Sequence, residues 1–156
     1  MESKQNKPAW SNVAEVELIY RSHVKASERP LITSSKDGYD TFLKVWDESK
    51  LEFQEEFKVL LLNQANRVIG VYQASSGGIT GTVADPRLIL VAALKGCSVS
   101  IILAHNHPSG NLKPSRADQD LTAKIKEAAR FLDIKVLDHL IVTPEGYYSF
   151  ADEGLL

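Results

Sequence analysis

The chain has 156 residues, of which 44% are hydrophobic and 24% charged, and its formal net charge is −2. These values fit a soluble globular domain, and the charge gives no support to direct nucleic-acid binding, although a local basic patch remains compatible with it. The single cysteine, Cys97, excludes an intrachain disulfide, a Cys-rich structural zinc site and the paired cysteines of zinc deaminases. The sequence has neither a signal-peptide core nor the roughly 20 apolar residues of a membrane span, so we expect a cytoplasmic protein without membrane contacts.

The first 50 residues predict an arm, a strand and a helix. Residues 1–11 are polar and predict a flexible amino-terminal arm, and residues 12–156 predict a single domain. Val13–Val24 is rich in β-branched and aromatic residues, which predicts a strand. Ser34 and its neighbours supply an N-cap for a helix that we expect to end near Glu48, since apolar residues recur there at a spacing of three to four.

The rest of the chain alternates between strand-like and helix-like segments. Two apolar runs around a polar turn predict a β-hairpin, Asp85 and Pro86 predict a helix start, and a wholly apolar run predicts a central strand. The predicted elements are a hairpin over 57–62 and 67–72, a loop or a bulged strand over 75–82, a helix over 85–95 stopped by Gly96, a strand over 99–104, a helix from 115 to about 132, a strand over 136–143 and a strand over 147–150. We therefore expect an α/β domain with a mixed β-sheet flanked by about three helices.

Potential metal ligands gather at the end of the predicted central strand. His105 and His107 are two of only four histidines in the chain, and Asp118 follows eleven residues after His107. Alternate residues of a strand face the same side, so the two imidazoles can converge. The turn after them is short enough to bring Asp118, in the first turn of the next helix, back to them. Two imidazoles and one carboxylate form the ligand set of a catalytic zinc site with one position left for water, which predicts one Zn²⁺ per chain and a hydrolytic reaction.

This spacing, with Pro114 and Ser115 just before Asp118, resembles the JAMM metal-binding motif of JAB/MPN metallopeptidases. The segments 101–110, 114–118, 137–142 and 149–150 resemble more closely the RadC subgroup of that family. The resemblance extends over residues 50–156 and implies a cytidine-deaminase-like α/β fold. It also implies zinc-dependent cleavage of an amide or isopeptide bond in an unidentified peptide or protein.

The resemblance further implies two catalytic residues. A glutamate before an apolar strand acts as general base in JAMM enzymes, which corresponds here to Glu56, with Glu52 and Glu55 close by as alternatives. Ser115 corresponds to the serine that stabilises the oxyanion, and it can also cap the helix.

Further residues match the RadC pattern without an assigned role, namely Asp138, His139 and Arg87. Asp138 and His139 are neighbours on a strand, so at most one of them can face the metal. Either residue fits a role in orienting a ligand, and His139 fits equally a histidine satisfied within the core. We expect His23 to be structural or exposed and Cys97 to be a small buried hydrophobic residue.

Two other functions stay open at this point. One is an accessory module in DNA repair or mobile elements with weak or no hydrolytic activity, since RadC proteins carry a DNA-repair label. The other is a metal-dependent nuclease, although a single zinc with this ligand set suits amide hydrolysis better than the two-metal arrangement common in phosphodiester cleavage.

Overall fold

A five-stranded mixed sheet forms the centre of the protein, seen here in a computed structural model that describes residues 13–14, 17, 19–77 and 83–156. The strands are β1 (Glu56–Leu62), β2 (Val68–Ser76), β3 (Ser100–Asn106), β4 (Lys135–Thr143) and β5 (Gly146–Ser149). Their order is β2-β1-β3-β4-β5, with β3 and β4 parallel and the other neighbours antiparallel. The expected α/β class and mixed sheet are therefore confirmed.

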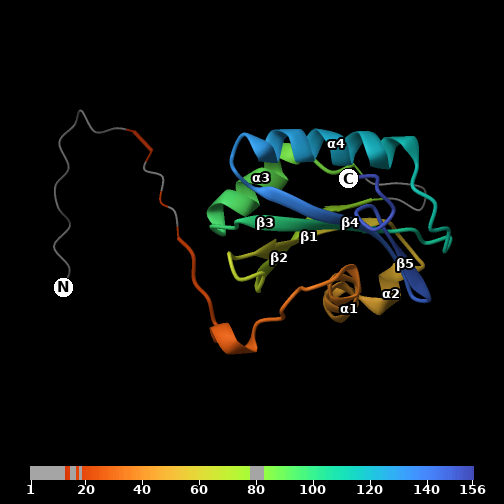
Figure 1. Cartoon of the computed structure of the whole chain (residues 1–156), viewed down its shortest axis with the longest axis horizontal. Helices are drawn as coiled ribbons and strands as arrows, with labels where there is room; N and C mark the ends of the chain where they lie inside the picture. The colour runs from red at the N-terminus through yellow and green to blue at the C-terminus, as the bar shows by residue number, and fades with distance from the viewer. Residues whose placement is uncertain (1–12, 15–16, 18, 78–82) are drawn as a thin grey trace.

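Helices cover both faces of this sheet (Figure 1). They are α1 (Ser35–Val45), α2 (Glu48–Leu51), α3 (Pro86–Lys95) and α4 (Arg116–Arg130), preceded by the 3₁₀ turn η2 (Ala26–Glu28). Helices α3 and α4 lie on one face, and α1 and α2 lie on the other. We call these the α4 face and the α1 face.

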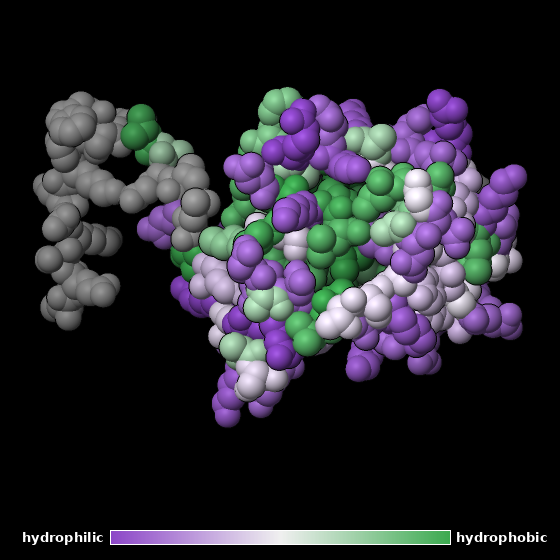
Figure 2. Space-filling view, viewed as in Figure 1, coloured by the Kyte–Doolittle hydropathy of each residue, from purple (hydrophilic) through white to green (hydrophobic). Residues whose placement is uncertain are grey.

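Strand alternation divides the core between the two faces. Phe57, Val59 and Leu61 of β1 pack toward α3 and α4, whereas Leu60 and Leu62 pack toward α1. In the view of Figure 2, hydrophobic residues gather in the middle of the molecule between hydrophilic surfaces on the outer helices. Strands β1 and β3 are buried along their whole length, as the apolar runs in the sequence predict.

The helix starts agree with the capping residues in the sequence. The hydroxyls of Ser34 and Ser115 each accept a hydrogen bond from the backbone N–H of the aspartate three residues on. The carboxylate of that aspartate accepts one from the backbone N–H of the serine, so α1 and α4 both begin with a capping box. Asp85 caps α3, with Pro86 in its first turn.

Three sequence-based expectations are wrong in detail. The described residues of Val13–Val24 form no strand, and Ser22 there hydrogen-bonds its own neighbouring backbone at Val24, which favours a turn. The helix expected to reach Glu48 ends at Val45, because Asp47 caps the separate helix α2. Cys97 is exposed rather than buried, and it lies in the turn just after α3, where its φ is +54°. The expected arm, residues 1–11, lies outside the described residues. So do residues 78–82 of the segment expected over 75–82, whose first two residues belong to β2.

No helix within the described part of the chain has the length and apolar character to cross a membrane.

Candidate metal centre

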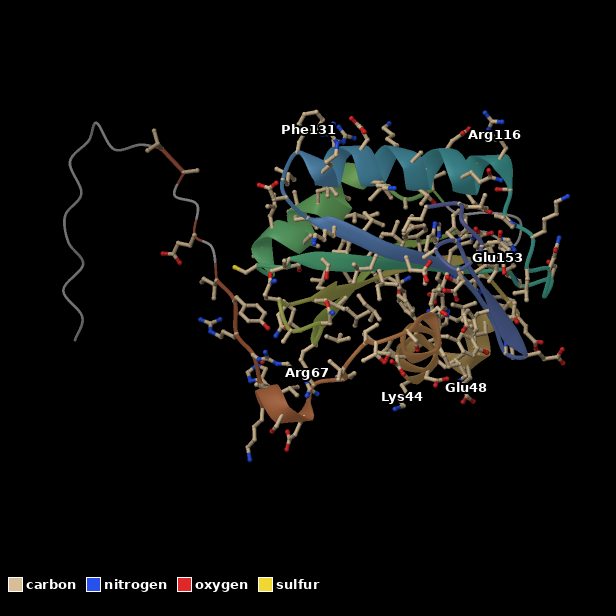
Figure 3. The ribbon with its side chains drawn as sticks, in the orientation of Figure 1. Lys44, Glu48, Arg67, Arg116, Phe131 and Glu153 are labelled. Carbon is tan, nitrogen blue, oxygen red and sulfur yellow. The ribbon has the colours of Figure 1, made fainter. Side chains whose placement is uncertain are left out.

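The three predicted ligands meet where β3 ends and α4 begins. The Nε2 atoms of His105 and His107 are 2.9 Å apart, and the Asp118 carboxylate lies 3.3 Å from the first and 3.7 Å from the second. Their ligand atoms all fall within 4.8 Å of one another. The site lies at the end of α4 that Arg116 marks in Figure 3.

Strand geometry and helix capping produce this convergence. His105 is the penultimate residue of β3, and the alternation of side chains turns it and His107 toward the α4 face and Asn106 to the other side. The capping box fixes Asp118, whose Oδ2 accepts a 2.7 Å hydrogen bond from the Ser115 amide while Oδ1 faces His105. The confirmed capping role of Ser115 thus also orients a potential ligand.

The hydrogen bonds of His107 test whether this site suits a metal ion. Its Nδ1 lies 2.5 Å from the carbonyl oxygen of Asn111, and a carbonyl only accepts, so Nδ1 carries the proton. In the neutral imidazole Nε2 is then a free lone pair, and it faces Nε2 of His105 at 2.9 Å. Two lone pairs that face each other at this separation repel, and a metal cation between them would relieve that repulsion. Two nitrogens and a carboxylate form the donor set that zinc prefers, so these residues fit the implied ion.

The electrostatics of the cluster point the same way. Burial would raise the pKa of Asp118, but His105 and His107, which can donate hydrogen bonds to it when they are protonated, outweigh that effect and hold its pKa far below its usual range. Burial would lower the pKa of His107, but its bonds to Asp118 and to the Asn111 carbonyl leave that pKa raised overall. The carboxylate is therefore ionised and the imidazoles attract a positive charge, as a cation site requires.

The structure does not bring Glu56 to this cluster. Its carboxylate is buried on the α1 face, 3.6 Å from the ammonium groups of both Lys50 and Lys58. The expected position is corrected by strand parity: Phe57 faces His105, so its neighbour Glu56 faces away.

Glu55 is the glutamate that senses the cluster. Burial raises the pKa of its carboxyl, while the charges of His105 and His107 partly lower it and Asp118 raises it again, with a net upward shift. A glutamate with a raised pKa, close to two imidazoles, is the better candidate for proton transfer at neutral pH.

Asn106, the residue between the two histidines, anchors the segment that carries Glu55. Its Oδ1 accepts a 2.7 Å hydrogen bond from the Glu56 amide, and its Nδ2 donates to the carbonyls of Leu51 and Gln54 at 2.8 and 2.9 Å. The side chain is fully buried. One tripeptide thus supplies two ligands on one face and, on the other, the clamp that positions the neighbouring glutamate.

The remaining candidates divide between core and surface. Asp138 points to the α1 face, where it accepts hydrogen bonds from the Ser149 hydroxyl and the Ala151 amide. Arg87 is exposed and pairs with its neighbour Asp85, and His23 is also exposed.

His139 does reach the cluster, because its Nε2 lies 2.7 Å from Nδ1 of His105. Burial lowers the pKa of His139 well below its ordinary value, so its ring is neutral. On its other side it contacts Thr122, which sequence reasoning missed. The available signal was spacing, since Thr122 stands one helical turn after Asp118.

Comparison with known proteins gives the family. A family model described as RadC-like JAB domain matches residues 32–155. The chain is 50% identical over 148 residues to a UPF0758 protein of Flavobacterium johnsoniae, covering 94% of this chain and 63% of the relative. It is 45% identical over 129 residues to a UPF0758 protein of Porphyromonas gingivalis, covering 82% of this chain and 56% of the relative. It is also 45% identical over 103 residues to UPF0758 protein YfjY of Escherichia coli, covering 66% and 64%.

The chain therefore spans less than two thirds of the length of each of these relatives. The match to the family model nevertheless includes the whole sheet and every residue of the candidate metal centre. On these grounds the chain belongs to the RadC family and carries a RadC-like JAB domain.

Proposed function

We propose that this domain is a zinc-dependent hydrolase that cleaves an amide or isopeptide bond in a peptide or protein. The observation that carries the proposal is the convergence of two histidine Nε2 atoms and an ionised aspartate at the end of β3. His105, His107 and Asp118 would hold the ion. When bound, zinc lowers the pKa of a coordinated water to about 7 and polarises the substrate carbonyl.

Glu55 is the proposed general base in place of Glu56. Its carboxyl is half-buried, its pKa is raised by that burial, and it lies in the field of both histidines. Such a group can take a proton from water and pass it to the leaving amine. Asn106 holds its segment from the opposite face, so the carboxylate stays in place without a bond to the ligands.

Ser115 is the proposed donor to the oxyanion. Its Oγ accepts the Asp118 amide at 3.0 Å, which turns the hydroxyl toward the start of α4 without using its hydrogen. That hydrogen is free to be donated to negative charge that develops on a substrate oxygen.

Metal content and a pair of glutamate variants test the proposal together. Elemental analysis of protein purified without added metal should find about one zinc per chain. With a panel of isopeptide-linked and linear fluorogenic peptides, Glu55→Gln should keep the zinc and lose about 100- to 10,000-fold in turnover. The matched control is Glu56→Gln, one residue along on the other face, which should keep the turnover of the folded protein.

Two results would contradict this assignment. A chain that takes up no zinc even when it is offered has no metal-dependent activity of this kind. Turnover that survives Glu55→Gln and disappears in folded Glu56→Gln would return the base to the α1 face.

A further inference from the structure

A chain of hydrogen bonds runs behind the candidate metal centre and returns to it. His105 Nδ1 lies 2.7 Å from His139 Nε2, and His139 Nδ1 lies 2.5 Å from the Thr122 hydroxyl. That hydroxyl bonds the backbone carbonyl of Asp118 at 2.6 Å. Asp118 is therefore at both ends of the series: its backbone carbonyl accepts from Thr122, and its carboxylate lies beside His105.

The backbone carbonyl of Asp118 determines which atom donates in each hydrogen bond of this series. A carbonyl oxygen only accepts, so the Thr122 hydroxyl donates its single hydrogen to the Asp118 carbonyl. Its oxygen must then accept from His139, whose Nδ1 carries a proton. A neutral imidazole with a proton on Nδ1 has a lone pair on Nε2, so His139 accepts from Nδ1–H of His105. The lone pair of His105 is left on Nε2, the atom that faces His107 and Asp118.

The surroundings keep His139 neutral and its ring fixed. The residue is completely buried, and its ring stacks on Phe150 with centroids 4.6 Å apart and meets the edge of Phe57 at 5.4 Å. Burial between two apolar rings disfavours a charged imidazole. A protonated His139 would donate to His105 instead and would place a proton on the ligating atom.

We infer that Thr122 and His139 are positioning residues that hold His105 in the one tautomer able to bind a metal through Nε2. The inference rests on the proposed function for the ion itself, but the proton arrangement belongs to the metal-free chain as well. It gives a role to a histidine and a threonine that lie behind His105 and outside the set of potential ligands.

Removing the Thr122 hydroxyl tests whether the hydrogen bonds from Thr122 through His139 fix the tautomer of His105. Thr122→Val keeps the branched shape and removes the acceptor of the His139 proton, so His139 can reverse its tautomer and donate to His105. Zinc affinity, measured by competition with a chelator, should fall by about 10- to 100-fold, as for other outer-sphere partners of metal ligands. The matched control, Thr122→Ser, retains the hydroxyl and should retain most of the affinity. The thermal unfolding of both metal-free variants shows whether a loss of affinity is merely a loss of fold.

The tautomer itself can be read without any substitution. Long-range ¹H–¹⁵N spectra of the metal-free wild-type protein resolve its imidazoles, of which the sequence has only four. At about pH 9, well above the ordinary imidazole pKa of about 6.5, His105 should show a proton on Nδ1 and none on Nε2. His139 should show the same tautomer.

Two outcomes would overturn the inference: a proton on Nε2 of His105 in the wild-type spectrum, or wild-type zinc affinity in folded Thr122→Val. Failure of the proposed function looks different. A wild-type chain that binds no zinc or cleaves no peptide contradicts the hydrolase, while the expected tautomers in the same protein would still support the positioning role of Thr122 and His139.

Discussion

The two faces of the sheet differ at the edge where β1 begins and β3 ends. On the α4 face lie His105, His107 and Asp118, whose polar atoms converge and are compatible with a metal site. On the α1 face Asn106 and Glu56 are held by backbone groups and lysines. The α4 face therefore carries the potential ligands, and the α1 face carries the contacts that fix the neighbouring backbone.

Adjacent residues supply both faces, so a contiguous motif contains two functions. Within His105-Asn106-His107 the outer residues are potential ligands and the middle one is a clamp. Within Glu55-Glu56 the charges of the His/Asp cluster shift the pKa of one carboxyl, and the other carboxyl pairs with lysines. The period of two in a β-strand separates them, and it makes single-residue substitutions a direct test of the division.

The largest effect should come from removing a ligand. His107→Ala should reduce zinc affinity by more than about 100-fold, beyond the range for outer-sphere partners, because it removes one of three donors. His23→Ala is the control, since that histidine is exposed in the amino-terminal segment. Stoichiometric zinc that persists through purification of His107→Ala would remove this residue from the ligand set.

The clamp on the other face should affect stability rather than metal binding. Asn106→Ala leaves the Glu56 amide and the carbonyls of Leu51 and Gln54 without their partner, in a fully buried position. We expect a loss of about 2–4 kcal/mol in the free energy of unfolding of the metal-free protein, measured by urea titration. Zinc affinity of the folded fraction should fall far less than in the ligand variant. If the two losses were reversed, the division between faces would be wrong.

The two glutamates sharpen the comparison further. Glu56→Gln removes the charge opposite Lys50 and Lys58 and should cost about 1–3 kcal/mol of unfolding free energy. Glu55→Gln should change it by no more than about 0.5 kcal/mol, because the burial of that carboxyl already disfavours its charge. Urea titrations of the two variants at neutral pH give the contrast, and equal losses would contradict it.

Much of the fold can be predicted from local signals. Capping residues, the proline at the start of α3 and the apolar runs of β1 and β3 place these elements within a few residues of their observed bounds. The segment Val13–Val24 shows the limit of such reasoning. Its composition favours a strand, but a strand exists only where a neighbour pairs with it, and pairing is not a local property.

The site shows the same limit. The set of three potential ligands can be predicted from the sequence because its spacing combines one strand end with one helix start. The choice between Glu55 and Glu56 depends on how β1 is registered against β3, where Phe57 pairs with His105. A shift of one residue would exchange the two glutamates between the faces. The contact of His139 with His105 likewise follows from the β3–β4 register, which sequence alone leaves open.

The smallest expected effect is the pH dependence of stability. The side chains of the candidate ligands titrate, whereas the amide of Asn106 does not, so the ligands on the α4 face should respond to pH and the clamp should not. The pKa of His107 in the folded chain is raised above the unfolded value of about 6.5, so its stabilising contact with Asp118 is complete below that pH. This stability is lost as the pH rises through the raised pKa. The pKa of Asp118 is lowered, so its own contribution is present above about pH 4 and fades only in stronger acid.

His139 works in the opposite direction, because burial lowers its pKa and stability falls when the unfolded chain takes up a proton below about pH 6.5. Comparison with His107→Gln therefore isolates the ligand. Between about pH 6 and 8.5 the metal-free wild type should lose unfolding free energy relative to this variant, and zinc affinity should rise because the ion no longer competes with a proton. A difference between the two proteins that stays constant over this range would show that His107 holds no proton against Asp118.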